Sequence, residues 1–227
     1  IKCWIQYKIR KMKNDIDIAI IDYGLSNLYS VDLACKKVGI NSKITSSSED
    51  IKKSKGIILP GVGAFDHAMH NLKEKKLDYA ISNFVETGKP FLGICLGMQL
   101  IMEESSEFKT TKGLGLVKGN CLKFDFQKKE KFSFPVPNVG WNKINQIGST
   151  WNKTLLSKNE DGDFMYFVHS YYVETVKEVV TTFSNYGKYE YCSSLSYENI
   201  HAMQFHPEKS GDKGLKIYSS LSDNLEK

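Results

Sequence analysis

The chain has 227 residues, of which 41% are hydrophobic and 25% charged, a composition typical of a globular protein with a buried core. No apolar run approaches the about 20 residues of a membrane span, so no membrane association is expected. The net charge is only +5 and the lysines are scattered among acidic residues, whereas a nucleic-acid surface would cluster them with aromatic residues.

The first half of the chain alternates between short apolar runs and segments with apolar residues every three or four positions. The runs favour strands and the spaced segments favour helices. The expected strands are 16–21, 41–45, 56–59 and 90–94, and the expected helices are 28–38, 64–87 and 96–105. Ser26 or Asn27 is expected to cap the first helix, and Gly39 to end it. This alternation predicts parallel βαβ units.

After Gly113 the chain changes to short, aromatic-rich β segments, and a final helix is expected at about 212–221. Residues 126–134 are expected to form a hairpin end or an exposed loop. No linker or internal repeat divides the chain. We therefore predict one α/β domain over 16–227, a mainly parallel central sheet flanked by helices with added antiparallel strands. Residues 1–15 form a basic N-terminal extension to which we assign no function.

A cysteine stands between two glycines where the strand 90–94 is expected to enter a helix. Gly93, Cys95 and Gly97 have the spacing of a nucleophile elbow, in which the tight strand-to-helix turn leaves no room for side chains two positions from the nucleophile. The helix N-terminus would also favour the thiolate. The alternative is a buried packing cysteine between close-packed elements.

The other cysteines show no such setting. The odd total of five, without a C-x-x-C pair, favours reduced thiols in a cytoplasmic protein. Cys35, Cys121 and Cys192 are interpreted as packing residues. His67 and His70 lack further ligands nearby, so no metal site and no cofactor are predicted.

A base for Cys95 is expected in the stretch QFHPEKS, 204–210. His206 and Glu208 are two apart in extended chain, so their side chains leave the same face and Glu208 can orient the imidazole. The alternative is a strand end followed by a turn.

Hydrolysis of an acyl group also requires donors for a developing oxyanion. Gly61, Val62 and Gly63 follow an expected strand, and their backbone can turn N–H groups toward a ligand. Leu96, directly after Cys95, is the other expected donor. The alternative is a simple loop between a strand and a helix.

Taken together, these stretches resemble a known family. GICLGMQ with FHPE is the signature pair of the class I, Cys-His-Glu glutamine amidotransferases. The stretches IIDYGLSNL, LPGVGAFDHAM, VGWN and YFVHSYYV resemble those of the branch that serves as amidotransferase subunits of imidazole glycerol phosphate synthases. The resemblance is collinear from Ile16 to Leu221 and implies a class I glutamine amidotransferase domain.

The resemblance implies the reaction and the residues that bind the substrate. Cys95 would attack the glutamine carboxamide, His206 would protonate the departing ammonia, and water would hydrolyse the thioester to glutamate. The residues implied to hold the substrate are Gln99, Glu107, His169, Ser170 and Tyr171. A heterodimeric partner, a (βα)₈-barrel cyclase subunit, would receive the ammonia and convert PRFAR to imidazole glycerol phosphate and AICAR in histidine biosynthesis.

The chain departs from the family pattern at three positions. Asn138 stands where the family usually has His, Tyr29 where it often has Arg, and Ser26 where it usually has Gly. The surface expected to face the partner contains Tyr29, Asn138, Trp141 and Lys209.

The departures leave the identity of the partner open, and three other functions stay open as alternatives. One is a paralogous subunit that supplies ammonia for amidation of a surface-polysaccharide sugar. A second is an inactive regulatory binding subunit, which predicts loss of a triad residue, and a third is a cysteine hydrolase such as a peptidase.

Overall fold

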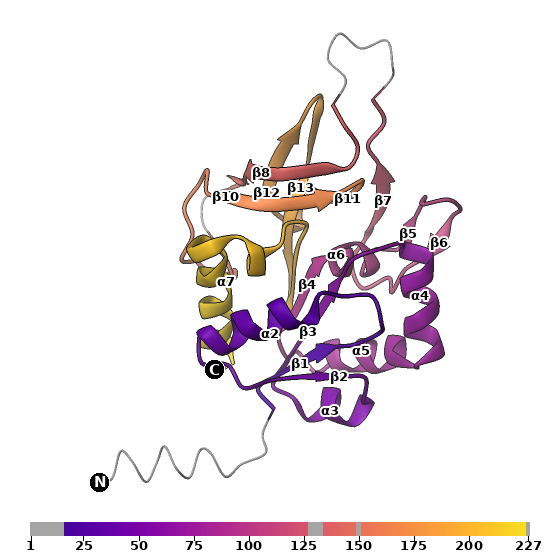
Figure 1. The fold of residues 1–227 in the computed structure, drawn as a ribbon, viewed down its shortest axis with the longest axis vertical. Helices are drawn as coiled ribbons and strands as arrows, with labels where there is room; N and C mark the ends of the chain where they lie inside the picture. The colour runs from indigo at the N-terminus through magenta and orange to yellow at the C-terminus, as the bar shows by residue number, and fades with distance from the viewer. Residues whose placement is uncertain (1–15, 127–133, 149–150, 226–227) are drawn as a thin grey trace.

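The computed structural model describes residues 16–126, 134–148 and 151–225. Five parallel strands form the core of its main sheet, in the order β2-β1-β3-β4-β14 (Figure 1). Their bounds are Ser42–Thr45, Ile18–Ile21, Gly56–Gly61, Phe91–Cys95 and Ile200–Met203. The expected α/β fold with a parallel core is confirmed.

Beyond β14 the sheet is extended mostly by antiparallel pairs, beginning with β13, although β5 and β7 pair in parallel. The order continues β13-β11-β7-β5-β6, while β12 pairs with both β13 and β9. Their bounds are Tyr189–Tyr197 for β13, Tyr171–Thr175 for β11, Gly119–Lys123 for β7, Glu104–Ser105 for β5, Thr111–Lys112 for β6, Val180–Tyr186 for β12 and Asn145–Gln146 for β9. Strands β8 (Asn138–Lys143) and β10 (Phe164–His169) form a separate antiparallel pair.

Helices cover both faces of the parallel core, whose strands β1, β3, β4 and β14 are buried on both sides. Ala19 and Ile21 pack toward the helices α3, α4 and α5, whereas Ile18 and Ile20 pack toward α2 and α7. The helix bounds are Ser48–Lys53, Phe65–Glu74, Leu77–Val85, Leu28–Lys37 and Gly211–Asn224, in that order. Figure 1 shows α2 and α7 lying together on one face, where they contact each other. A short helix, α6 (Leu96–Leu100), follows β4, and single 3-10 turns occur at η1 (Lys177–Val179) and η2 (Pro207–Lys209).

Two expected helices differ in extent or number, and one further helix was not expected. The pattern over 64–87 forms two helices because Lys76 adopts a left-handed conformation with φ 55°. The helix expected over 96–105 ends at Leu100, since residues 113–117 return alongside it and their amides take the carbonyls of Leu100, Ile101 and Met102. The short helix α3 was not expected, although Ser47 caps it through the amide of Asp50.

The first helix, α2, begins and ends near the expected residues. Asn27 is its N-terminal flanking residue but makes no side-chain cap, and Ser26 instead donates its hydroxyl to the carbonyl of Pro60, 3.0 Å away. Gly39 follows the helix with φ 82°, a conformation that suits glycine.

Two expectations fall on residues that the structure does not describe. The N-terminal extension 1–15 lies there completely, and most of the expected loop 126–134 does too. Among the residues that are described, no helix is both long and apolar enough to cross a membrane.

Candidate active site

Cys95 occupies a strained turn between β4 and α6. Its φ of 53° and ψ of −107° are rare for a residue with a side chain. A Cβ on Gly97 would overlap the carbonyl oxygen of Leu59, and one on Gly93 would crowd the carbonyl of Gly97 at 3.0 Å. The structure therefore gives this turn the geometry of a nucleophile elbow, with the glycines required by close backbone contacts.

The strand β14 runs parallel to β4 and carries the chain to His206 and Glu208. His206 Nδ1 lies 2.7 Å from Glu208 Oε1, and both side chains are buried. Because a carboxylate only accepts, this contact places a proton on Nδ1. Among the described residues, Nε2 has no hydrogen-bond partner.

Charge around His206 favours its protonated form. Burial acts against protonation, but the thiolate of Cys95 and the carboxylate of Glu208 outweigh it and raise the pKa of His206 to about 10. The backbone of His206 is fixed by bonds to the carbonyl of Tyr166 and from the hydroxyl of Ser210.

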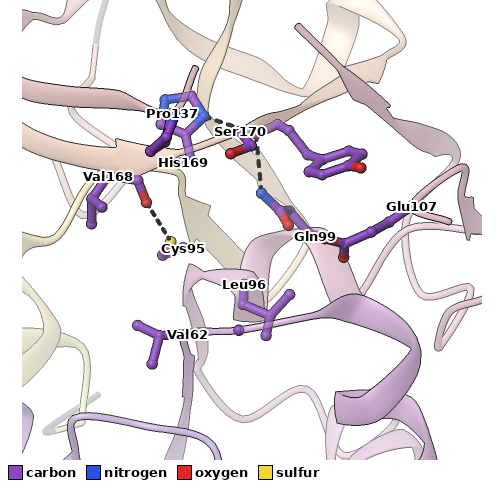
Figure 2. Close-up of a pocket in the computed structure, with 11 residues that line it drawn as sticks. Val62, Cys95, Leu96, Gln99, Glu107, Pro137, Val168, His169 and Ser170 are labelled. Carbon is purple, nitrogen blue, oxygen red and sulfur yellow. Dashed lines mark hydrogen bonds between the residues drawn. The ribbon is translucent and has the colours of Figure 1, made fainter. Parts of the chain in front are cut away.

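A pocket of about 250 Å³ opens beside Cys95 (Figure 2). It brings together residues of β4, α6, β10, β11 and the loop after β3. Its lining residues are Val62, Gly63, Cys95, Leu96, Gln99, Glu107, Pro137, Val168, His169, Ser170 and Tyr171. All five residues expected to hold the substrate are among them, as are three of the four expected oxyanion residues.

The fourth oxyanion residue, Gly61, lies outside this lining. It ends β3 directly beside Cys95 in the sheet register, and a Cβ there would overlap the hydroxyl of Tyr23. The neighbouring Val62 lines the pocket, but its N–H donates to the carbonyl of Leu25 at 3.0 Å. In this conformation the Val62 amide is thus engaged outside the pocket.

Two substrate-binding candidates are held by backbone groups. Gln99 donates through Nε2 to the carbonyl of Tyr171, 3.1 Å away. Glu107 accepts from the amide of Phe65 at 2.6 Å, which places its carboxylate at the N-terminus of α4. These contacts preorganise one amide and one carboxylate along the pocket wall.

His169 is buried and neutral. Burial lowers its pKa to about 4, and its Nδ1 lies 2.8 Å from the carbonyl of Tyr171. Since a carbonyl only accepts, Nδ1 carries the proton and Nε2 accepts from Asn138 Nδ2 at 3.2 Å.

The residues expected to face a partner divide into exposed and buried positions. Tyr29 is 71% exposed, Trp141 is 57% exposed, and Lys209 is also exposed and lies over the ring of Tyr166. Asn138 differs from this expectation because its side chain is only 5% exposed. It bonds to His169 and to the hydroxyl of Tyr191, so any effect on an interface must pass through them.

One buried residue near the nucleophile was not singled out from the sequence. Gln204 lies between Gln99 and Cys95, with its Nε2 3.6 Å from Cys95 Sγ. It stands two positions before His206. The sequence signal for it was a polar residue within a short apolar stretch, 202–205.

The chain matches a family model described as glutamine amidotransferase class-I over residues 19–219. The chain belongs to the class I glutamine amidotransferase family. This amidotransferase is 42% identical over 211 residues to proteins named imidazole glycerol phosphate synthase subunit HisH from Bacillus cereus (strain G9842) and Bacillus thuringiensis (strain Al Hakam). Each alignment covers 92% of this chain and 95% of the relative.

Solved structures of lower identity share the amidotransferase fold. A crystal structure of a glutamine amidotransferase superimposes with a TM-score of 0.69 at 16% identity, covering 93% of this chain and 100% of the other. A structure of PurLQS from Thermotoga maritima gives a TM-score of 0.66 at 19% identity, covering 92% and 98%. At these identities the likeness shows the fold alone, and it confirms the expected fold class.

Proposed function

We propose that this chain is the glutaminase subunit of imidazole glycerol phosphate synthase. It hydrolyses glutamine to glutamate and ammonia and passes the ammonia to a separate cyclase subunit. The observation that carries the proposal is the strained Cys95 at a pocket, together with the buried His206–Glu208 pair. The 42% identity to two HisH subunits supports the choice of this synthase.

The first half of the reaction forms a thioester. The Cys95 sulfur attacks the carboxamide carbon of glutamine, and a carbon–sulfur bond forms while the carbonyl oxygen gains negative charge. Backbone amides of Leu96 and the 61–63 segment are the proposed donors to that oxygen. The carbon–nitrogen bond then breaks, and ammonia leaves with a proton from His206.

The second half consumes water. His206, now neutral, takes a proton from a water molecule as the water attacks the thioester carbon. The carbon–sulfur bond breaks, glutamate leaves with its new γ-carboxyl group giving the second water proton to solvent, and Cys95 returns to the thiolate beside protonated His206. Glu208 holds the imidazole in one tautomer throughout, because its carboxylate accepts from Nδ1 at 2.7 Å.

The acceptor of the ammonia is proposed to be a barrel-type cyclase subunit. At neutral pH free ammonia would be mostly protonated and no longer nucleophilic, so a docked acceptor makes use of it before it is lost. The exposed Tyr29, Trp141 and Lys209 are the proposed contacts. In the proposed reaction the cyclase converts PRFAR to imidazole glycerol phosphate and AICAR. The cytoplasmic location expected for this chain stays a prediction.

Complementation tests the assignment to histidine biosynthesis. The chain and the cyclase from the same organism are expressed together in a histidine auxotroph lacking its own amidotransferase subunit. We expect growth without histidine, and no growth with Cys95→Ala. If a soluble complex forms and hydrolyses glutamine but does not support growth, the assignment fails and the sugar-amidating paralogue becomes the better interpretation.

A further inference from the structure

We propose that Gln204 is a positioning residue for the nucleophile: its side-chain amide donates a hydrogen bond to Cys95 and stabilises the thiolate. The inference deepens the glutaminase function proposed above and rests on it.

Gln204 is placed beside Cys95 by the sheet and has no access to solvent. It directly follows β14, its exposed fraction is 0%, and its backbone amide donates to the carbonyl of Ser193 at 2.9 Å. Its Nε2 lies 3.6 Å from Cys95 Sγ, and its Oε1 lies 3.0 Å from Gln99 Nε2. The side chain therefore spans from a pocket residue to the reacting sulfur.

The orientation of the Gln204 amide is fixed by its neighbours. Gln99 Nε2 also contacts the carbonyl of Tyr171, which only accepts, so the nitrogen end of Gln99 must face both partners. Gln204 must then present its oxygen to Gln99, because two facing NH₂ groups cannot bond. Its own nitrogen is thereby directed at Cys95.

The same carbonyl anchors a longer series of bonds. His169 donates through Nδ1 to the Tyr171 carbonyl and accepts from Asn138 at Nε2. The two lone pairs of one backbone oxygen thus hold His169 on one side and Gln99 on the other. Because a backbone group sets the direction, neither Gln99 nor Gln204 can reverse its amide without losing a buried bond.

A donor to the sulfur matters most when Cys95 is ionised. The thiol can donate to the carbonyl of Val168, 3.8 Å away, but the thiolate loses that bond and faces the negative end of the carbonyl dipole. Cys95 is only 5% exposed, so water supplies little compensation. The Gln204 N–H offsets this loss and favours the charged form.

The test measures thiolate formation at Cys95 with iodoacetamide. Alkylation rates of the full chain are followed by peptide mass spectrometry from pH 5 to 9, in wild type and in Gln204→Met, an apolar side chain of similar length. We expect the midpoint of the Gln204→Met profile to rise by about one pH unit, with alkylation slowed about tenfold at pH values below the wild-type midpoint. Glutamine hydrolysis should fall at least as much.

A matched control separates this role from a loss of stability. Ser193→Ala removes a buried hydroxyl that bonds to Thr182 on the neighbouring strand, without touching Cys95. It should lower the melting temperature but leave the alkylation profile unchanged. A Gln204→Met profile that coincides with wild type in a folded protein would overturn the proposal.

Two further measurements keep the result unambiguous. If Gln204→Met does not fold, Gln204→Asn retains the amide but is too short to bridge Gln99 and Cys95, and the same shift is expected; an unshifted profile overturns the proposal. Glutamine hydrolysis by wild type with its cyclase is measured in parallel. Its absence would refute the proposed function, whereas the alkylation profiles judge Gln204 independently.

Discussion

Cys95 combines chemical reactivity with a backbone conformation that costs folding energy. Its positive φ directs the sulfur out of the sheet and toward the pocket, with the side chain attached to the last residue of β4. Conformations of this kind cost about 1–3 kcal/mol and persist where the surrounding structure enforces them. Here the enforcing contacts are the close approaches of Gly93 and Gly97 to backbone.

Replacing Cys95 should separate activity from strain. Cys95→Ala and Cys95→Gly both remove the nucleophile, so each should lower glutamine hydrolysis by several orders of magnitude. Cys95→Gly should be the more stable of the two by about 1 kcal/mol, because glycine adopts φ 53° without a steric cost. Urea denaturation and glutamate release measure the two effects. Equal stability of the variants, or glutamate release near the wild-type rate, would contradict the argument.

The candidate triad was recognisable from sequence because each member lies in a short segment whose own residues carry a signal. The glycines around Cys95 and the spacing of His206 and Glu208 are local patterns. Gln204 gave no such pattern, since its partner Gln99 lies 105 positions away and only the pairing of β4 with β14 brings them together. Burial of Asn138 was equally hidden, because it depends on the packing of Tyr191 and His169.

At the scale of elements, α6 is joined to the sheet by contact between backbones. Gly97 lies directly against the carbonyl of Leu59 on β3, so helix and strand are closer than side chains would permit. This closeness brings the start of α6 and the segment after β3 to the same end of the pocket. The oxyanion candidates therefore depend on one glycine.

Gly97→Ala should destabilise the protein by about 3 kcal/mol, since the added methyl overlaps backbone that cannot move without disturbing β3. Gly115→Ala is the control. Gly115 has φ 65°, but no other atom lies within 4 Å of the place that an added methyl would take, so only the backbone cost of about 1 kcal/mol is expected. Denaturant midpoints compare the two variants. A Gly97→Ala protein as stable as Gly115→Ala would refute the close-contact argument.

Element types were largely predictable, but the ends of elements were not. The expected strands of the parallel core are all present; β1, β3 and β4 gave a clear pattern because they are apolar runs buried on both faces, whereas β2 is a partly exposed edge strand. The early end of the helix from Leu96 could not be predicted from its own residues. Its last carbonyls bond to residues 113–117, a segment that the chain reaches only after β5 and β6.

At the scale of the whole molecule, two buried histidines should make stability depend on pH. Burial lowers the pKa of His169 and of His201 to about 4, against an unfolded value of about 6.5. As pH falls through this window the unfolded chain binds up to two more protons than the folded one. His206, whose folded pKa is about 10, is protonated in both states below about pH 5.5; between pH 5.5 and 6.5 the folded chain holds its proton more tightly, which partly offsets the two buried histidines.

The free energy of unfolding should therefore fall from pH 6.5 toward pH 4, by about 1.4 kcal/mol per pH unit for each histidine at the steepest part. His201→Gln should remove one of the two contributions and reduce the slope by about half, while leaving the pocket intact. Urea unfolding at intervals between pH 5 and 6.5 measures the slope. If the free energy of unfolding of His201→Gln depends on pH as strongly as that of wild type, His201 has the same pKa in the folded and unfolded states and the argument fails.

Partner docking should control the rate of glutamine hydrolysis. With the Val62 N–H bonded to Leu25, we expect the isolated chain to be a poor glutaminase. Binding of the cyclase with its own substrate should favour an orientation that turns an amide of this segment toward the oxyanion, and raise turnover at least tenfold. Equal turnover with and without the partner would rule out this coupling.

The proposed docking face can be tested by comparing two exposed aromatic residues, one on that face and one away from it. Trp141→Ala should weaken cyclase binding at least tenfold, since exposed tryptophans at interface centres carry much of the binding energy. Tyr79→Ala removes a similarly exposed ring from α5, which contributes nothing to the pocket lining, and should bind as wild type does. Titration calorimetry with the purified cyclase gives both affinities. Similar losses in the two variants would place the interface elsewhere.

The position of β14 in the middle of the sheet has a consequence for biosynthesis. This strand comes from residues 200–203 yet lies between β4 and β13, so the edge of β4 that it covers stays unpaired until the ribosome has made about a hundred further residues after β4. The open edge of β4 belongs to an apolar strand of the kind that pairs with other chains. Until β14 inserts, the nascent protein is prone to aggregate, and it is also inactive because His206 and Glu208 follow β14 in the chain.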